Sequence, residues 1–466
     1  MTEPRPATAL DHIPTLVAQT RQSFVSGRTK PISWRLAQLR GIEALIVERR
    51  RELSVALAAD LGKSETEAYL TELSIVRHEA QLAQRQLRRW LRPKPVGVGL
   101  ALTPARAWTM LEPLGTVLII GPWNYPVQLV LAPLVGAVAA GNAAVVKPSE
   151  LAPATSALLA KLLPNYLDAD AVTVVEGGAD ETQALLAERW DHIFYTGGSR
   201  VARIIARSAA EHLTPITLEL GGKSPAFVDG SGDLDTVARR LVWAKFTNAG
   251  QTCIAPDYVL ATKDAVPRLE RALTAAITEL YGPDPMRSPD FARIVNRRHF
   301  DRLTAFLGGG RTVAGGTSDP DALRIAPTVL GDVNPASPVM AEEIFGPILP
   351  IVPVADAREA IAFINARPKP LALYTFTAHR RVERAFERGT SSGSLVHGFA
   401  IAQASIAELP FGGVGESGMG AYHGEASVRV FSHEKSVATK PLRPDTLKVA
   451  YPPYSRAQQK LLRGLL

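Results

Sequence analysis

Apolar residues in the first ninety positions recur at the spacing of a helix. Between residues 69 and 90 an apolar side chain falls every three or four positions, which places these side chains on one helix face. The stripe consists of Tyr69, Leu73, Val76, Ala80, Ala83, Leu87 and Trp90. The helical pattern is then broken by Pro93, Pro95 and Pro104. We therefore expect helices up to residue 92, followed by an extended arm at Val96–Leu102.

Short apolar runs alternate with longer segments from Thr116 onwards. The expected strands are Thr116–Ile120, Ala143–Val146, Val172–Val175, Ile193–Tyr195, Thr217–Leu220 and, later, Leu395–Val396. The expected helices are Pro126–Ala140 (closed by Gly141), Ser156–Leu163, Thr182–Glu188, Val201–Ala210, Leu234–Phe246 and Ala265–Leu280. This alternation predicts an α/β fold with right-handed crossovers and a parallel sheet, whose ligands bind at the carboxyl ends of the strands.

The composition of the 466 residues is that of a globular protein of two or three packed units. The single cysteine excludes an internal disulfide and a multi-cysteine metal site, and we expect no metal. The segment Met1–Leu10 has no apolar core, and the most apolar window, Val127–Val146, is interrupted by proline, glycine and polar residues. We therefore predict a cytoplasmic protein without a secretory signal or a membrane anchor.

The net charge of +7 has two interpretations, a nucleic-acid-binding surface and a solvated basic surface. Many of the arginines lie between Arg28 and Arg92, where they alternate with apolar residues at helical spacing. No nucleic-acid-binding motif accompanies them, which favours the solvated surface. A nucleic-acid partner is therefore not expected.

Candidate chemistry begins with Cys253, which follows Gly250-Gln251-Thr252. Most lone cysteines are inert core residues. A glycine and small polar residues before the thiol, however, suit a loop beside a ligand, where a reactive cysteine would need partial access and a lowered pKa.

Two further residues are candidates for proton transfer and charge stabilisation. Glu219 ends an apolar run before Gly221-Gly222, and is either an exposed strand end or a poorly solvated carboxylate whose raised pKa makes it a usable base. Asn124 lies between an expected strand and an expected helix. Its amide is either part of a turn or a donor to a developing oxyanion.

Two other segments suit a nucleotide. Lys147-Pro148-Ser149-Glu150 follows an expected strand and could bond a ribose diol or form a solvated turn. Tyr195-Thr196-Gly197-Gly198-Ser199 joins a strand to a helix, and such a turn favours a phosphate at the helix N-terminus. It lacks the three spaced glycines of the dinucleotide fingerprint and is a weak signal by itself.

Taken together, seven motifs in order resemble the aldehyde dehydrogenase superfamily over nearly the whole chain. They are GPWNYP (121–126), KPSE (147–150), YTGG (195–198), ELGGKSP (219–225), GQTC (250–253), EEIFGP (342–347) and LPFGGVGESGMG (409–420). The segments GQTCIAPDY (250–258), AYHG (421–424) and YPPY (451–454) resemble the class 3 branch, which oxidises medium- and long-chain aliphatic and aromatic aldehydes.

The resemblance implies three structural parts and a homodimer. They are a Rossmann-like dinucleotide-binding domain at 1–92 and 107–221, an α/β catalytic domain at 222–412, and a small β oligomerisation arm with a C-terminal tail at 93–106 and 413–466. Exposed strands of this kind usually pair with a partner subunit. In detail, the arm is expected at Pro93–Arg106, pairing with the chain after Gly420.

The resemblance also assigns catalytic roles. Cys253 would attack the aldehyde to give a thiohemiacetal and then a thioester. The side chain of Asn124 and the backbone N–H of Cys253 would stabilise the oxyanion. Glu219 would activate the water that hydrolyses the thioester, and could also take the thiol proton.

The implied cofactor is NAD, with NADP also possible. The residues expected to bind it are Trp123, Lys147, Glu150, Gly197, Gly198, Ser199, Leu220, Gly221, Glu343 and Phe345. Lys147 and Glu150 would lie near the adenosine ribose, where the Glu150 carboxylate would repel a 2′-phosphate and favour NAD. Glu343 would hold the nicotinamide ribose.

Two positions depart from the family pattern. Ala202 stands where glycine is usual, in a place expected to affect helix packing more than cofactor contact. His397 stands where asparagine is usual, so the resemblance does not determine the geometry of the substrate pocket. We favour a structural role for this histidine over a role as a proton shuttle.

Two rival functions remain within the superfamily. A coenzyme-A-acylating dehydrogenase usually lacks the glutamate found at Glu219, and a non-catalytic member would be expected to have lost Cys253, Glu219 or Asn124. The physiological aldehyde stays undetermined.

Overall fold

Helices form the N-terminal part of the computed structural model, which describes residues 7–465. Part of the Met1–Leu10 segment, from which we predicted no secretory signal, therefore lies outside the described residues. The helices are α1 (Ile13–Val25), α2 (Ile32–Glu48), α3 (Arg50–Leu61), α4 (Glu65–Ala68), the π-helical turn η2 (Tyr69–Leu73) and α5 (Ser74–Trp90). The helical prediction for this region is confirmed.

The first sheet has the order β17-β7-β6-β3-β4-β5. Its strands are β3 (Thr116–Ile120), β4 (Ala143–Lys147), β5 (Val172–Val174), β6 (His192–Thr196), β7 (Ile216–Glu219) and β17 (Gly418–Met419). All pairs are parallel except the one between β7 and β17. The chain enters this sheet at β3, adds β4 and β5 on one side of it, and later adds β6 on the other side. The strand order therefore reverses between β3 and β6. Ligands of doubly wound sheets bind at such a switch point.

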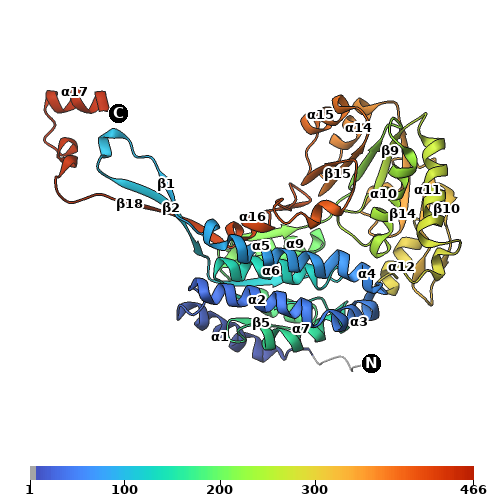
Figure 1. The fold of residues 1–466 in the computed structure, drawn as a ribbon, viewed down its shortest axis with the longest axis horizontal. Helices are drawn as coiled ribbons and strands as arrows, with labels where there is room; N and C mark the ends of the chain where they lie inside the picture. The colour runs from blue at the N-terminus through green and yellow to red at the C-terminus, as the bar shows by residue number, and fades with distance from the viewer. Residues whose placement is uncertain (1–6, 466) are drawn as a thin grey trace.

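Helices cover both faces of this sheet (Figure 1). The further helices of this part are α6 (Gln128–Ala140), α7 (Pro153–Tyr166), α8 (Ala179–Ala187), α9 (Ser199–Glu211) and α16 (Gly424–Val430). Val117 and Ile119 pack with α2, α5 and α6, whereas Leu118 and Ile120 pack with α1, α8 and α9. This alternation follows from the two-residue period of a strand. As predicted, α6 ends at Gly141, whose φ of 94° is left-handed.

The second sheet has the order β10-β13-β14-β9-β8-β15-β16 and is parallel except between β10 and β13. Its strands are β8 (Pro225–Val228), β9 (Tyr258–Thr262), β10 (Arg311–Ala314), β13 (Thr328–Gly331), β14 (Ile348–Val354), β15 (Ala372–Phe376) and β16 (Ser394–His397). The helices around it are α10 (Leu234–Phe246), α11 (Val266–Tyr281), α12 (Arg297–Thr304), α13 (Pro338–Ala341), α14 (Ala357–Asn365) and α15 (Arg380–Gly389). A short hairpin pairs β11 (Ser318–Asp319) with β12 (Arg324–Ile325). Two helix-covered sheets confirm the predicted α/β class.

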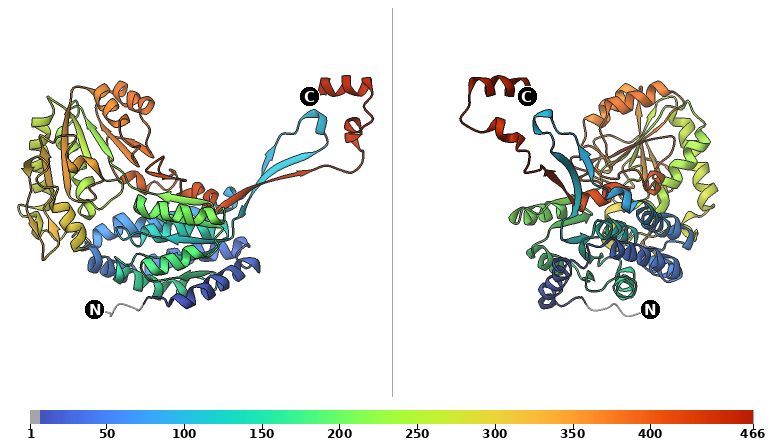
Figure 2. Two further views of the ribbon diagram at one scale, coloured as in Figure 1. Left: turned by 180° about the vertical axis from the view of Figure 1, so that it is seen from behind. Right: turned by 60° about the vertical axis from the view of Figure 1, so that its left-hand side comes forward.

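A three-stranded ribbon projects from the body of the molecule (Figures 1 and 2). It pairs β1 (Lys94–Val96) with β2 (Arg106–Pro113), and β2 with β18 (Ser432–Thr439), all antiparallel. The C-terminal helix α17 (Arg456–Leu465) lies at its far end. The prediction of an extended segment throughout Val96–Leu102 is wrong, because Leu100–Leu102 form a 3-10 turn. The chain after Gly420 pairs mainly with β2 rather than with 93–106.

Part of the predicted C-terminal tail contacts the first sheet. β17 pairs with β7, and α16 packs against α5 and α6. Residues 418–430 therefore lie beside the first sheet, whereas the sequence assigned 413–466 to the arm and tail, and the remaining domain boundaries stay predictions. No helix within residues 7–465 is long and apolar enough to cross a membrane.

Candidate active site

Cys253 follows a strained turn at the end of α10. The 3-10 segment η4 (Thr247–Gly250) contains Asn248 and Ala249 at φ values of 53° and 51°, which non-glycine residues seldom adopt. Ile401 and Phe345 also have positive φ values, of 54° and 50°. Such strain persists where surrounding structure enforces it, and it collects at functional sites.

A cavity of about 340 Å³ opens beside the Cys253 sulfur. Much of its wall is apolar, including Leu129, Trp243, Ile254, Ile401, Phe411 and Tyr422. These side chains come from both sheet-containing units and from the glycine-rich segment after β16, so the cavity lies where the units meet. Its shape suits an apolar ligand with a reactive group at the thiol.

The thiol itself is not acidic in this environment. Burial raises the pKa of Cys253 to about 12, and the neighbouring carboxylates of Glu343 and Glu219 add to the rise. Hydrogen bonds from the backbone N–H groups of Cys253 and Ile254 oppose it. The expectation that a reactive cysteine carries a lowered pKa is therefore not met in the protein alone, and the thiol requires a base.

Glu219 has the properties of a buried base. It lies at the end of β7, opposite Gly418 of β17, and is 2% exposed. Burial raises the pKa of its carboxyl well above the ordinary value. Neither carboxyl oxygen has a hydrogen-bond partner within residues 7–465. An unpaired buried carboxyl group is costly, which is the mark of a group kept available for a ligand or a proton.

Asn124 approaches the same loop from the first sheet. It follows β3, at the switch point, and its Nδ2 donates to the Gln251 carbonyl at 3.0 Å, two residues before Cys253. The adjacent Tyr125 hydroxyl lies 2.5 Å from Thr252 Oγ1. One amide hydrogen of Asn124 is thus engaged, which orients the amide and leaves the second hydrogen for another acceptor.

Glu343 and Phe345 join this group from the segment before β14. A Cβ atom at Gly221 would lie only 2.0 Å from Glu343 Oε2, so the carboxylate occupies space that any other residue at 221 would fill. Burial raises the pKa of Glu343 to about 8. The rings of Trp123 and Phe345 meet edge to face at 5.4 Å between centroids. The structure therefore brings together the predicted residues Cys253, Glu219, Asn124, Gly221, Glu343, Trp123 and Phe345.

The remaining predicted cofactor residues lie along the carboxyl edge of the first sheet. Lys147 ends β4, is 2% exposed, and places its Nζ 3.2 Å from Glu150 Oε2. The turn after β6 leads through Gly197 and Gly198 into Ser199, the first residue of α9. A Cβ atom at Gly198 would meet nothing within 4 Å, so the helix N-terminus is open to a phosphate. These residues fit an NAD(P) cofactor. Leu220, which follows the last residue of β7 and precedes Gly221, is 7% exposed.

The two departures from the family pattern have structural partners. Ala202 belongs to α9 and is buried in the core, which agrees with the expected effect on helix packing. His397 Nδ1 lies 2.6 Å from Thr375 Oγ1, and His397 Nε2 lies 3.4 Å from Glu387 Oε1. These contacts agree with a structural histidine.

Sequence reasoning missed the cavity wall and an ion pair beneath Asn124. Trp243 lies in a segment that the sequence identified only as a helix, and Phe411 and Tyr422 lie in family motifs that the sequence did not assign to a cavity wall. Lys63 and Glu72 form a fully buried pair that no local pattern singled out.

Comparisons with known proteins agree with this geometry. The aldehyde dehydrogenase family model matches residues 5–437. Aldehyde dehydrogenase family 3 member A2 of Macaca fascicularis is 47% identical over 95% of this chain and 91% of its own length. Family 3 member H1 of Arabidopsis thaliana is 47% identical over 97% and 94%.

Solved structures show the same relationship. The substrate-bound state of Staphylococcus aureus AldH has a TM-score of 0.94 at 42% identity, covering 97% of this chain and 99% of that one. Mycobacterium tuberculosis aldehyde dehydrogenase complexed with NAD+ has a TM-score of 0.85 at 26% identity, covering 93% and 91%. The chain therefore belongs to the aldehyde dehydrogenase family, and it catalyses the NAD(P)-dependent oxidation of an aldehyde.

Proposed function

We propose that this enzyme oxidises aldehydes with a medium or long aliphatic substituent, or an aromatic one, to carboxylic acids, with Cys253, Glu219 and Asn124 as its catalytic residues. The observation that carries the proposal is the largely apolar cavity that Cys253 helps to line. Its wall would cover the substituent while the carbonyl carbon meets the thiol. The unpaired carboxyl of Glu219 supports hydrolysis as the final step.

The proposed mechanism begins with proton removal from the thiol. Because its raised pKa makes the Glu219 carboxylate a stronger base than an exposed one, it takes the Cys253 proton and releases it to solvent. The sulfur adds to the aldehyde carbon, and the oxyanion accepts hydrogen bonds from the Asn124 amide and the Cys253 backbone N–H. The nicotinamide, when bound, supplies the hydride acceptor that turns the thiohemiacetal into a thioester. Glu219 then takes a proton from the water that attacks the thioester. The C–S bond breaks, the carboxylic acid leaves, and the Cys253 thiolate regains a proton from Glu219.

The cofactor roles are also proposed, on the positions of the side chains. Lys147 and Glu150 would hold the adenosine ribose, and the open N-terminus of α9 after Gly197 and Gly198 would receive the pyrophosphate. Glu343, beside Gly221, would bind the nicotinamide ribose. The contact between Trp123 and Phe345 would form the wall of that site.

NAD is the preferred cofactor in this proposal, and Glu150→Gln is expected to shift the preference towards NADP. The carboxylate would repel a 2′-phosphate, and its removal would also free Lys147 to bind that phosphate. Because the Glu150 side chain is 49% exposed, solvent screens the repulsion to about 1 kcal/mol, which is a several-fold change in the ratio of kcat/KM values.

Steady-state kinetics with both cofactors measure this ratio. Glu211→Gln is the matched control, because it removes the same charge at the C-terminal end of α9, away from the proposed pyrophosphate site. It should leave the ratio unchanged. An unchanged ratio in Glu150→Gln would show that this carboxylate does not face the 2′ position.

Longer aldehydes should be better substrates. Each methylene buried in the cavity contributes about 0.8 kcal/mol, so kcat/KM should rise about fourfold per added methylene until the cavity is filled. NADH production over straight-chain aldehydes and benzaldehyde tests this. Ser74→Trp, which narrows the cavity, should reduce the gain, whereas Ser26→Trp, an exposed position, should not. A flat series in the wild type would contradict the proposal.

The projecting ribbon supports a homodimer as the assembly. The ribbon exposes large apolar side chains, including Val96, Leu100 and Leu102 at 50%, 75% and 48%, and Leu442, in the segment after β18, is 92% exposed. Exposed apolar surface on unpaired strand edges favours pairing with another subunit. We also propose the cytoplasm as the compartment, because the one cysteine stands in a proposed role that requires a free thiol.

A further inference from the structure

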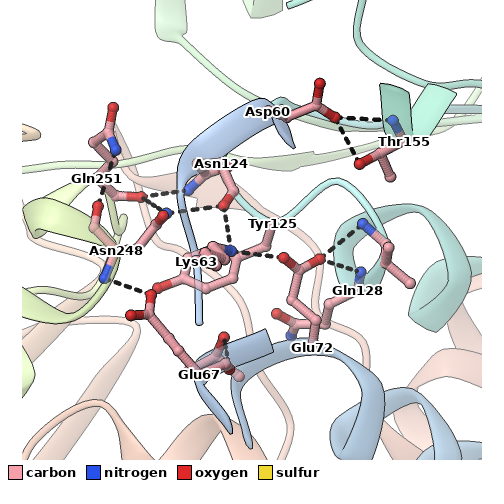
Figure 3. A network of polar contacts seen from close by, with 12 residues as sticks. Asp60, Lys63, Glu67, Glu72, Asn124, Tyr125, Gln128, Thr155, Asn248 and Gln251 are labelled. Carbon is pink, nitrogen blue, oxygen red and sulfur yellow. Dashed lines mark hydrogen bonds and ion pairs between the residues drawn. The ribbon is translucent and has the colours of Figure 1, made fainter. Parts of the chain in front are cut away.

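A buried ion pair lies under the loop that carries Asn124 (Figure 3). Lys63 Nζ lies 2.6 Å from Glu72 Oε1, and both side chains are 0% exposed. Removing two charges from water is costly, and apolar replacements of such pairs are often equally stable. Stability by itself therefore gives little reason for this pair, and its contacts indicate what it does.

The pair holds both ends of the short loop between Asn124 and α6. Lys63 Nζ donates to the Asn124 carbonyl at 2.9 Å. Glu72 Oε2 accepts from the backbone N–H groups of Val127 at 2.8 Å and Gln128 at 3.1 Å, at the start of α6. One carboxylate thus satisfies two otherwise unpaired donors of a helix N-terminus, while its cationic partner fixes the residue that carries the catalytic amide.

The same contacts extend to the loop of the nucleophile. Asn248 Nδ2 donates to the Asn124 carbonyl at 2.8 Å and to the Gln251 carbonyl at 3.1 Å. Glu67 Oε1 accepts from the backbone N–H of Asn248 at 2.8 Å, within the strained turn before Cys253. The carbonyl of Asn124 therefore receives two donors, one from each side, which sets the position of its backbone.

The helix that supplies Glu72 is itself irregular. Glu72 lies in the π-helical turn η2, between α4 and α5, and π-helical turns are frequent at functional sites. Leu70 and Thr71 of this turn line the substrate cavity. One turn thus contributes to the cavity wall and also provides the carboxylate beneath the Asn124 loop.

We propose that Lys63, held by Glu72, is a positioning residue for the reaction, which keeps the Asn124 amide aligned with the oxygen of the reacting aldehyde. The inference rests on the proposed oxyanion role of Asn124. Lys63 acts through the Asn124 backbone, and neither member of the pair lines the cavity.

The test uses the full-length enzyme with Lys63→Met and Glu72→Gln combined, which removes both charges and nearly preserves their shapes. The glutamine oxygen can still accept bonds from α6, so the helix start is kept. Because removal of an oxyanion donor costs about 10²–10³-fold in kcat, misalignment should lower kcat by about 10–100-fold. The KM for NAD and the melting temperature should change little.

Asp60→Asn is the matched control. Asp60 is a buried carboxylate that accepts bonds from Ala154 N and from Thr155 N and Oγ1 at the start of α7 (Figure 3). Both oxygens of Asp60 accept bonds from α7, so asparagine turns one of these acceptors into a donor and weakens the cap of a buried helix without a contact to the Asn124 loop. It should alter stability while leaving kcat at saturating substrates unchanged.

A mutant cycle with Asn124→Ala separates positioning from a general structural effect. If the pair acts through Asn124, its loss in the Asn124→Ala background should lower kcat by less than about twofold, because coupled residues are not additive. If the pair substitution lowered kcat by the same factor with and without Asn124→Ala, or if the folded double variant kept the wild-type kcat, the inference would be overturned but the proposed function would not. A wild-type kcat in Asn124→Ala would overturn the proposed oxyanion role and the inference together. If the double variant does not fold, Lys63→Met takes its place in the cycle.

Discussion

Cys253→Ala should abolish aldehyde oxidation, lowering kcat by at least about 10⁴-fold, while binding of NAD stays within a few-fold of the wild type. The chain has no other thiol, so no neighbouring sulfur can replace the nucleophile. The alanine removes one atom beside the cavity and leaves the switch point of the first sheet unchanged. Steady-state kinetics measure kcat, and displacement of fluorescent NADH by NAD measures NAD binding. Turnover near the wild-type rate would refute covalent catalysis.

Iodoacetamide provides an independent measurement on the same residue. It should add one label per wild-type chain and none to Cys253→Ala, as determined by mass spectrometry, with loss of activity parallel to labelling. Burial raises the pKa of the thiol to about 12 in the protein without cofactor. The thiolate fraction, and with it the labelling rate, should therefore rise about tenfold per pH unit between pH 7 and 10. A rate that is flat over this range would show that the thiol is already ionised in the free enzyme.

Glu219→Gln should stall after a single turnover. An amide cannot take a proton from the attacking water at neutral pH, so the thioester on Cys253 should persist. Rapid mixing with NAD and an aldehyde should give at most one equivalent of NADH per active site, followed by turnover about 10²–10⁴-fold slower than the wild type. Mass spectrometry should find the acyl group on Cys253.

The burst itself distinguishes the two proposed tasks of Glu219. If the carboxylate also deprotonates Cys253, the burst in Glu219→Gln should be slow at pH 7 and faster at higher pH, where hydroxide removes the proton. The trapped thioester is expected in either case. Glu416→Gln, an exposed glutamate paired with Arg203, is a control of identical chemistry that should keep full turnover. Fast multiple turnover in Glu219→Gln, or recovery only on addition of coenzyme A, would favour the acylating alternative.

The sequence by itself determined the helices of the first ninety residues, most elements of the first sheet and the positions of the chemical groups. Thr116–Ile120 and Leu234–Phe246 were predicted with the boundaries that the structure has, because the hydrophobic pattern of an element acts within a few residues. The motifs also placed Cys253, Glu219 and Asn124 correctly at strand ends or loops, since these positions depend on local chain geometry.

Only the tertiary structure decided the environment of those groups. Glu219 is buried and unpaired because β17, from a distant part of the chain, pairs with β7. Cys253 has a raised pKa, contrary to expectation, because segments from distant parts of the chain bury it and place the carboxylates of Glu343 and Glu219 nearby. Lys63 has two partners, Asn124 and Glu72. Neither lies at a helical spacing from Lys63, and the two are far apart in the sequence. Desolvation and ion pairing depend on which segments meet in space, whereas periodicity reports only which face of one element is apolar.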